Sequence, residues 1–414
     1  MIRIPLILSL LALLPASAIA QTTWYVPGDS STIQGAIFLA TTGDYILVSP
    51  GTYTENLDLL GKGLIIKSTD GAATTTINGM ANETLVLLNN TPSGTEVEGF
   101  LLTGGSGHPS PSSFGYDYYG GAVHASNGAK ATIRNCFLIR NAIGTGTFAG
   151  GAYSGGSGTH LELEYCVIAY NEAWASGGAT LADGYGKISL RKCTVFGNTS
   201  TNFFGYQGGV AGANDGDTWI DDSIIWGNEG DDIGAFGAPY NVGVDFYVNY
   251  SDVDGGWAGT GNIDADPLFA GSLSSDFYLR PLSPCINTGD PNSPSETDGS
   301  PADMGAFPFE GPGLHTSPLV AGEIAHITVN NATPSEKVWI GYSLVGGGPY
   351  SSSWGAILLS PPFSFLSPRL ANSAGQLRIH RNVLSTLPIG QMVWMQAFDA
   401  GSLSLSNGIS LTVQ

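Results

Sequence analysis

Residues 133–141 read IRNCFLIRN, and similar stretches follow at 163–171 (LEYCVIAYN), 190–198 (LRKCTVFGN) and 220–228 (IDDSIIWGN). Each stretch has Cys or Ser at its fourth position and Asn at its ninth, so the pattern returns after 30, 27 and 30 residues. Repeats of this length are typical of solenoids. Apolar residues alternate around the fourth position, which predicts strands, and a Gly-Gly pair before each stretch marks a corner of the chain.

The repeat extends beyond these four stretches in both directions. Ile66 and Val97 fit the aliphatic first position upstream, and Val248 fits it downstream, which gives about seven coils. The residue after this aliphatic position should point outward, and down the stack it alternates between basic and acidic types. This charge column consists of Lys67, Glu98, Arg134, Glu164, Arg191, Asp221 and Asn249. Stacked parallel strands would place opposite charges side by side, which supports this register.

Three cysteines occupy the same inward position in consecutive coils. Cys136, Cys166 and Cys193 are expected to pack as small apolar side chains. Because the Cα atoms of adjacent strands are close enough for a disulfide, one neighbouring pair could instead be oxidised. Cys285 lies outside the repeat. The recurring Asn is expected to bond to the backbone or to the next Asn along the axis, which is a structural role.

Composition and the N-terminus indicate an exported chain. Residues 1–20 read as a secretory signal, with Arg3, an apolar run from Ile4 to Leu14 and the small residues Ala18-Ile19-Ala20. This run is too short to span a membrane, so we expect a secreted or cell-surface protein, and a monomer. A net charge of −20 argues against nucleic acid as a partner, because a basic surface would be needed.

Both ends of the repeat region are distinctive. Ile33, Ala36, Ile37 and Ala40 have helical spacing, which predicts a short helix covering the first coil. With its Asn and aliphatic ladders, the chain resembles the right-handed parallel β-helix, or pectin-lyase-like, superfamily. Residues 261–269 (GNIDADPLF), 276–279 (DFYL), 283–290 (SPCINTGD) and 303–307 (DMGAF) resemble the end segment of secreted bacterial β-helix proteins called choice-of-anchor Q. The resemblance implies a right-handed parallel β-helix over residues 21–310 and presentation at the cell surface, but no reaction.

The texture of the sequence changes after the junction Gly311-Pro312-Gly313. Residues 316–414 contain short alternating strands, which predict a small antiparallel β-sandwich. The expected strands are 324–329, 338–342, 376–380, 392–398 and 409–413. This part resembles C-terminal modules that recur on unrelated exported bacterial proteins, which implies sorting, anchoring or binding.

Aromatic residues on loops beside the coils are the candidates for binding a glycan. The insertion 104–119 is rich in them, and aromatic rings on an exposed loop are suited to stacking against sugars. The alternative is that these side chains only cover the flank of the solenoid. The candidates are Tyr116, Tyr118, Tyr119, Trp174, Tyr206 and Trp226.

Acidic residues gather in the late coils, where they could form a calcium site or a solvated acidic face. The calcium candidates are Asp231, Asp232, Asp252 and Asp254. Relatives in the superfamily include polysaccharide lyases, hydrolases and esterases, but the hydrolase motifs and the later esterase motifs are absent, so no catalytic residue is assigned. We therefore expect a non-catalytic protein that binds a polysaccharide or matrix glycan, or is adhesive, and needs no cofactor. The alternative is a calcium-assisted polysaccharide lyase or another carbohydrate-active enzyme.

Overall fold

The computed structural model describes residues 21–414 except 80–82, 113–114, 142–145, 202–206, 237–242, 270–276, 280–282, 297–300, 310, 349, 353, 374 and 407. The predicted signal segment, residues 1–20, therefore lies outside the described residues. Three long parallel sheets occupy the first part of the chain, and antiparallel sheets follow after residue 312. The fold is a parallel β-helix, as the repeats predict, followed by an antiparallel β-sandwich, as the alternating strands of residues 316–414 predict.

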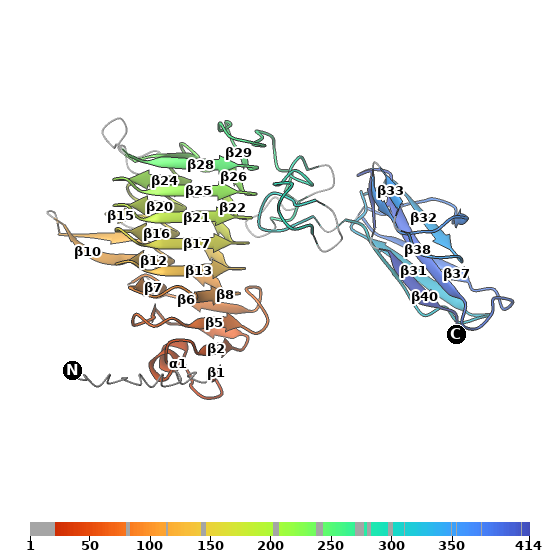
Figure 1. Ribbon diagram of the computed structural model, residues 1–414, viewed down its shortest axis with the longest axis horizontal. Helices are drawn as coiled ribbons and strands as arrows, with labels where there is room; N and C mark the ends of the chain where they lie inside the picture. The colour runs from red at the N-terminus through yellow and green to blue at the C-terminus, as the bar shows by residue number, and fades with distance from the viewer. Residues whose placement is uncertain are drawn as a thin grey trace, which may run out of the picture.

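The coils are stacked into one column, and each of the three parallel sheets runs along this column (Figure 1). The nine-stranded sheet contains β1 (Thr23–Val26), β2 (Tyr45–Val48), β5 (Ile65–Ser68), β8 (Thr95–Glu98), β13 (Lys130–Arg134), β17 (His160–Glu164), β21 (Lys187–Arg191), β25 (Asp217–Asp221) and β28 (Asp245–Asn249). The eight-stranded sheet contains β3 (Gly51–Tyr53), β6 (Thr75–Asn78), β9 (Leu101–Thr103), β14 (Phe137–Ile139), β18 (Val167–Ala169), β22 (Thr194–Phe196), β26 (Ile224–Trp226) and β29 (Asp252–Val253). The seven-stranded sheet contains β4 (Leu57–Asp58), β7 (Val86–Asn89), β12 (Val123–Ser126), β16 (Ala152–Gly155), β20 (Thr180–Asp183), β24 (Val210–Ala213) and β27 (Ile233–Ala235).

In the middle coils, one left-handed residue lies where the chain enters the eight-stranded sheet and another lies where it leaves. Asn135 (φ 51°) separates β13 from β14, and Arg140 (φ 56°) follows β14. The next coil repeats this left-handed backbone at Tyr165 and Tyr170. One left-handed residue turns the chain sharply while the flanking residues stay extended, so consecutive coils can stack in register.

The register of the coils is the predicted one. Ile66, Val97 and Ile133 are paired in sequence across β5, β8 and β13, and Ile220 is paired with Val248. The charge column follows, with ion pairs of 2.8 Å from Lys67 to Glu98 and from Arg134 to Glu164, and of 3.5 Å from Arg191 to Glu164. The sheet extends two strands further than the predicted coils, through β1 and β2.

The repeated cysteines and asparagines are inside the column. Cys136, Cys166 and Cys193 are fully buried and free, as is Cys285, so none of them forms a disulfide. Burial raises the pKa of the Cys136 and Cys166 thiols well above the ordinary value. The repeated asparagines, Asn141, Asn171, Asn198 and Asn228, are bonded in series along the axis.

A helix closes the lower end of the column, as predicted. In α1 (Ile33–Leu39) the residues Ile33, Ala36 and Ile37 are buried against the first coils. The Glu55 carboxylate accepts hydrogen bonds from the backbone N–H groups of Ile33 and Gln34, and Lys62 Nζ donates to the carbonyls of Ile37 and Ala40. Both ends of the helix are thereby satisfied. Within the described residues, no helix is long and apolar enough to cross a membrane.

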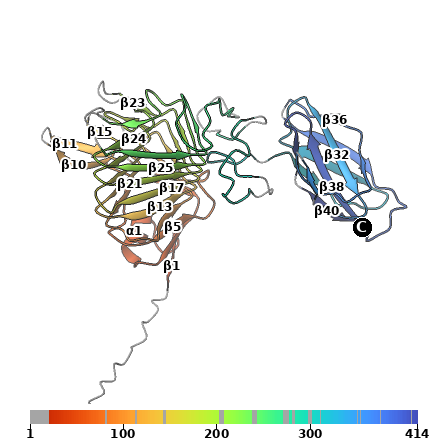
Figure 2. The same cartoon turned by 45° about the horizontal axis from the view of Figure 1, so that its top comes forward.

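Short strands outside the three long sheets lie on the column, and a hairpin projects from it. The hairpin consists of β10 (His108–Ser112) and β11 (Gly115–Tyr119), with β15 (Thr147–Phe148) paired to β11. A further pair is β19 (Glu172–Ala173) with β23 (Thr199–Ser200). The view in Figure 2 shows the hairpin strands to one side of the coils.

The predicted end segment lies against the eight-stranded sheet. The Asp222 carboxylate accepts hydrogen bonds from the Asp290 backbone and the Ser293 hydroxyl, and the Ala306 N–H donates to Thr194 Oγ1. Lys192 forms a short, buried ion pair with Glu296. These contacts bind Asp290, Ser293, Glu296 and Ala306 to successive coils of the column.

The antiparallel part consists of sheets that share one apolar cluster, formed by alternate residues of both main sheets. One sheet contains β30 (Gly313–Thr316), β31 (Ile324–Asn330) and β37 (Leu377–Asn382). The facing sheet contains β32 (Lys337–Ser343), β35 (Phe363–Phe365), β36 (Arg369–Leu370), β38 (Met392–Asp399), β39 (Ser404–Leu405) and β40 (Ile409–Thr412). A small hairpin contains β33 (Tyr350–Ser352) and β34 (Gly355–Ile357). The five strands predicted from the alternation are all present, with ends that differ by a residue or two.

Candidate functional site

The predicted aromatic insertion is the β10–β11 hairpin, and its tyrosines differ in role. Tyr116 is 62% exposed, whereas Tyr119 stacks on Phe148 at 5.1 Å and contacts Tyr153 at 4.7 Å. Burial, with help from Asp117, raises the pKa of Tyr119 to about 12. Tyr119 therefore anchors the hairpin, while Tyr116 is available to a ligand.

Two histidines fasten this hairpin to the coils. The buried His124 on β12 donates from Nδ1 to the Tyr119 carbonyl at 3.2 Å, and its ring lies 4.8 Å from that of His108. His108 in turn bonds to Glu83 through Nδ1 at 2.8 Å. Burial, followed by the charge of His108, lowers the pKa of His124 to about 4. An imidazole that remains neutral in this way can pack among the aromatic rings.

The remaining aromatic candidates do not form one surface. Trp174 is 38% exposed and lies beside β15, because its backbone N–H donates to the Thr147 carbonyl. Trp226 is on the eight-stranded sheet, where it packs with Leu279 and Met304 under the end segment. Tyr206 lies outside the described residues. The structure thus brings Trp174 near the hairpin and places Trp226 on a different sheet.

A stacked aromatic pair on the outer face of the nine-stranded sheet is one that the sequence analysis missed. Trp219 on β25 and Tyr247 on β28 are paired in register on the outer face of the nine-stranded sheet. Their rings are stacked at 5.1 Å with an angle of 11°, and Tyr247 is 45% exposed. The predicted charge column is only one of the outward columns of this sheet. The neighbouring outward column, from Ser189 through Trp219 to Tyr247, would have revealed the pair.

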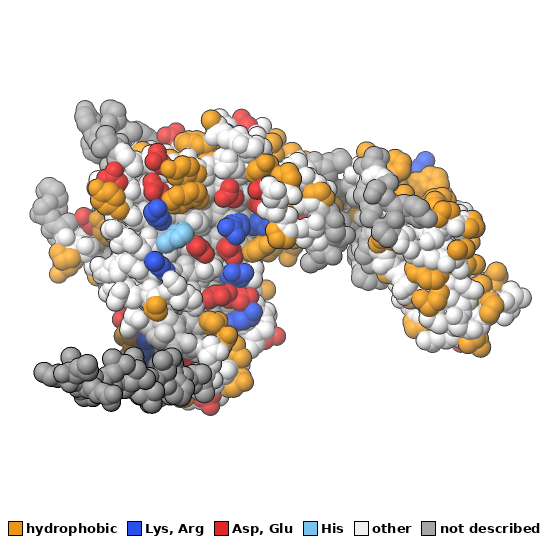
Figure 3. Space-filling view, viewed as in Figure 1, with side chains coloured by type: hydrophobic (Ala, Val, Ile, Leu, Met, Phe, Trp, Pro, Cys, Tyr) orange, Lys and Arg blue, Asp and Glu red, His pale blue; other side chains and the backbone are white. Residues whose placement is uncertain are grey.

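Charged side chains line one side of this aromatic pair. Three of them are in register on neighbouring strands: Lys187 on β21, Asp217 on β25 and Asp245 on β28. Lys187 Nζ lies 5.0 Å from the centre of the Trp219 ring and 3.8 Å from the Asp217 carboxylate. Figure 3 shows this face, where hydrophobic side chains adjoin basic and acidic ones. The combination places apolar ring surface next to hydrogen-bonding groups.

On the far side of β21 from the aromatic pair, an imidazole contributes to the same face. His160 on β17 bonds through Nε2 to the Ser189 hydroxyl at 2.8 Å, and its ring lies 6.4 Å from that of Trp219. Burial lowers the pKa of His160. We call the surface formed by His160, Lys187, Asp217, Trp219 and Tyr247, with Asp245 at its edge, the β-face site.

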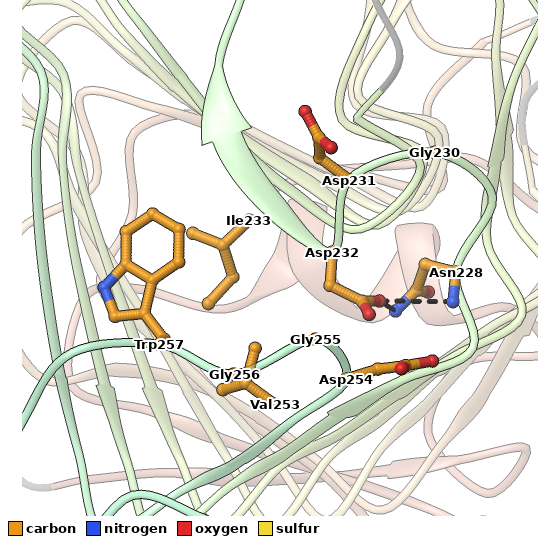
Figure 4. Close-up of a pocket in the computed structure, with 10 residues that line it drawn as sticks. All are labelled: Asn228, Gly230, Asp231, Asp232, Ile233, Val253, Asp254, Gly255, Gly256 and Trp257. Atoms are coloured by element: carbon orange, nitrogen blue, oxygen red, sulfur yellow. Dashed lines mark hydrogen bonds between the residues drawn. The ribbon is translucent and has the colours of Figure 1, made fainter. Parts of the chain in front are cut away.

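Three of the four calcium candidates line a polar pocket of about 380 Å³ beside β27 and β29, the last strands of their sheets (Figure 4). Asp232 accepts hydrogen bonds from Asn228 Nδ2 at 2.5 Å and from the Asn228 backbone at 3.2 Å. It therefore terminates the asparagine series, and burial raises its pKa to about 7. The carboxylates of Asp231 and Asp254 point in other directions (Figure 4).

The fourth candidate is separated from the pocket. Asp252 accepts hydrogen bonds from the Cys285 thiol and the Ala265 backbone, both at 3.1 Å, and burial raises its pKa to about 6. A raised pKa favours the protonated carboxyl, whereas calcium requires the carboxylate. Among the residues that the structure describes, no group of three or more His, Cys, Asp or Glu side chains could hold a metal ion.

The fold defines the class of protein as a parallel β-helix with an antiparallel C-terminal part. Comparison of the sequence with profiles of known protein families and with curated proteins finds no match.

Proposed function

We propose that this chain is an extracellular or cell-surface glycan-binding protein, and that the β-face site binds the glycan. The observation that carries the proposal is the stacked pair of the half-buried Trp219 and the exposed Tyr247 on a parallel sheet. The predicted signal segment and the resemblance to exported, pectin-lyase-like proteins with a choice-of-anchor Q end segment support an extracellular location. The C-terminal β-sandwich would then serve in sorting, anchoring or binding.

The two rings lie nearly parallel and stacked, so the exposed Tyr247 and the outer edges of the pair can contact a sugar. The C–H groups on one face of a pyranose ring are apolar and pack on an aromatic ring, while its hydroxyls need hydrogen-bonding partners at the rim. Lys187, Asp217 and Ser189 provide such partners on the strands beside the rings. Because all these residues are on strands, their positions are fixed before the ligand arrives, which reduces the entropy lost on binding.

A screen of the purified chain against immobilised polysaccharides and oligosaccharides tests the proposal, followed by calorimetry on whichever glycan binds. Trp219→Ala should weaken binding by about tenfold, because an aromatic contact contributes about 1 kcal/mol or more. Trp174→Ala is the matched control, since Trp174 is also partly exposed but lies beside the hairpin. A glycan whose affinity is unchanged by Trp219→Ala and Tyr247→Ala would show that the β-face site is not its site.

A second candidate function, a calcium-assisted polysaccharide lyase, is supported by the position of Lys187. This amine adjoins the Asp217 carboxylate at the edge of the aromatic pair, and Asp245 is next in register. A lyase needs a base beside carboxylates that can hold calcium. Incubation with acidic polysaccharides and calcium should then produce ultraviolet absorbance from unsaturated products, and Lys187→Ala should abolish it. Binding without such products would leave the non-catalytic function.

A further inference from the structure

Two of the six histidines in the chain face each other directly on the antiparallel sheet of the C-terminal part. His326 on β31 and His380 on β37 are paired in register. Their Nδ1 atoms are 2.8 Å apart, and the rings are nearly perpendicular, at 85°. At this distance one Nδ1 donates a hydrogen bond to the other, so both nitrogens are close enough together to bind one ion once the donor ring carries its proton on Nε2 instead.

The backbone beneath this pair is rigid, and the pair itself is open to solvent. Both strands alternate between buried and accessible residues here, so His326 and His380 are exposed while Ala325, Ile327 and Ile379 are in the apolar cluster. The inward side chains fix the strands, and the outward imidazoles need little rearrangement to act together. A ligand that takes two imidazole nitrogens at once can reach them from solvent.

We propose that His326 and His380 form a binding site for a divalent transition-metal ion, and that Cu²⁺ fits it best. Neutral imidazole is a ligand for Cu²⁺, Ni²⁺ and Zn²⁺. With metal–nitrogen bonds of about 2.0–2.1 Å, the observed nitrogen separation corresponds to an angle of about 90° at the metal. That angle suits the square or tetragonal geometry of Cu²⁺, whereas tetrahedral Zn²⁺ would need the nitrogens further apart. Water would complete the coordination sphere.

The charges around the histidine pair do not attract cations, so binding there would have to come from coordination by the imidazole nitrogens. Arg378 is two residues before His380 on the same face and is exposed, so the positive charge beside the pair repels a cation. The many acidic residues of the chain, 34 against 14 Lys and Arg, will attract cations to other surfaces. Excess Ca²⁺ occupies carboxylates but does not compete for imidazole nitrogen, because it prefers oxygen ligands.

Titration of the purified chain with Cu²⁺ in the presence of excess Ca²⁺ tests the site, followed by absorbance and electron paramagnetic resonance. One equivalent should bind with couplings to two imidazole nitrogens. His326→Gln and His380→Gln should each weaken binding on the order of 10²-fold, because a single imidazole lacks the chelate advantage. The double variant, which has neither imidazole, should bind at least as weakly as either single variant.

Two matched variants test whether binding is specific to this histidine pair. His108→Gln removes an imidazole from the hairpin and should leave Cu²⁺ affinity unchanged. Arg378→Gln removes the nearby positive charge and should leave affinity unchanged or slightly higher. Melting curves without metal check that each variant is folded. Unchanged affinity and unchanged nitrogen couplings in both His326→Gln and His380→Gln would overturn the proposal.

Discussion

Replacement of Asn171 by Asp changes the chemistry of a site where the whole amide is used. Asn171 is completely buried, and its Nδ2 donates to the Leu138 carbonyl at 2.8 Å and to Asn198 Oδ1 at 2.9 Å. Its Oδ1 accepts from the backbone and side-chain nitrogens of Asn141, at 2.9 and 3.1 Å. A residue in the middle of this series must therefore donate and accept at once.

The expected loss follows from the bonds that Asp cannot make. A carboxylate retains the two accepted bonds, but both donated bonds are lost and its second oxygen faces two acceptors. Each buried polar group left without its partner costs about 1 to 3 kcal/mol, so Asn171→Asp should lower the free energy of unfolding by about 2 to 6 kcal/mol. That is a large part of the stability of a typical domain, which is about 5 to 15 kcal/mol.

The matched control is the reverse exchange at the end of the same series. Asp232 only accepts from Asn228, so Asp232→Asn preserves the required acceptor. The folded-state pKa of Asp232 is raised from 3.8 to about 7, so between these values the folded state binds more protons than the unfolded state. The stability of the wild type should therefore fall as pH rises through this window. Asp232→Asn should be more stable than the wild type at pH 8, by on the order of 2 to 4 kcal/mol, but not at pH 4.

Urea unfolding of both variants and the wild type, followed by circular dichroism at pH 4 and pH 8, measures these differences. If Asn171→Asp is as stable as the wild type at pH 8, the hydrogen-bonded series does not stabilise the column. The same experiment with added Ca²⁺ tests the calcium prediction. Calcium that stabilises the wild type but not Asp232→Asn would make Asp232 a ligand, and the reasoning about its protonation would be wrong.

Three other perturbations have defined outcomes. Arg191→Glu should cost about 1 kcal/mol through repulsion from Glu164, and salt should reduce the effect in melting curves because Arg191 is exposed. Cys166→Ser should cost about 1 to 3 kcal/mol in urea unfolding, since Ser223 is accepted further along the same stack, and a melt as low as that of Cys166→Asp would contradict this. His124, whose pKa is lowered to about 4, remains neutral in the folded state, whereas in the unfolded state it takes up a proton near pH 6.5. The free energy of unfolding should therefore fall on acidification between these pH values, and it should fall less in His124→Gln.

The parts of the fold that repeat could be predicted from the sequence. A position that recurs in consecutive coils has the same packing environment each time, so one register accounts for the burial of Cys136, Cys166 and Cys193 together. The alternating charges tested that register independently, and the ion pair of Arg134 and Glu164 confirms it. Period-two alternation likewise located the C-terminal strands, because each strand has one buried face.

The candidate site could not be predicted in the same way, because it depends on pairs of residues that do not repeat. Trp219 and Tyr247 lie on different coils and meet only through the register of β25 and β28. Loop aromatics were the expected binders, yet Tyr119 is used for packing and Trp226 is under the end segment. Burial of an individual ring depends on what covers it, which the pattern of one strand does not contain.

Residues that end a repeat are easily mistaken for functional ones, for a physical reason. Each hydrogen-bonded series in a solenoid must finish on a group with no successor, so its last member differs in type from the others. Asp232 finishes the asparagine series, and Asn262 accepts from the Ser251 backbone at 3.1 Å at the end of the Cys and Ser column. Such residues are polar, at least partly buried and unique in the stack, which are also the properties of a catalytic or metal site. Residues that close the column are therefore set aside as candidates for a functional site. Groups with no part in closing the column are better candidates, and the stacked rings of Trp219 and Tyr247 are such groups.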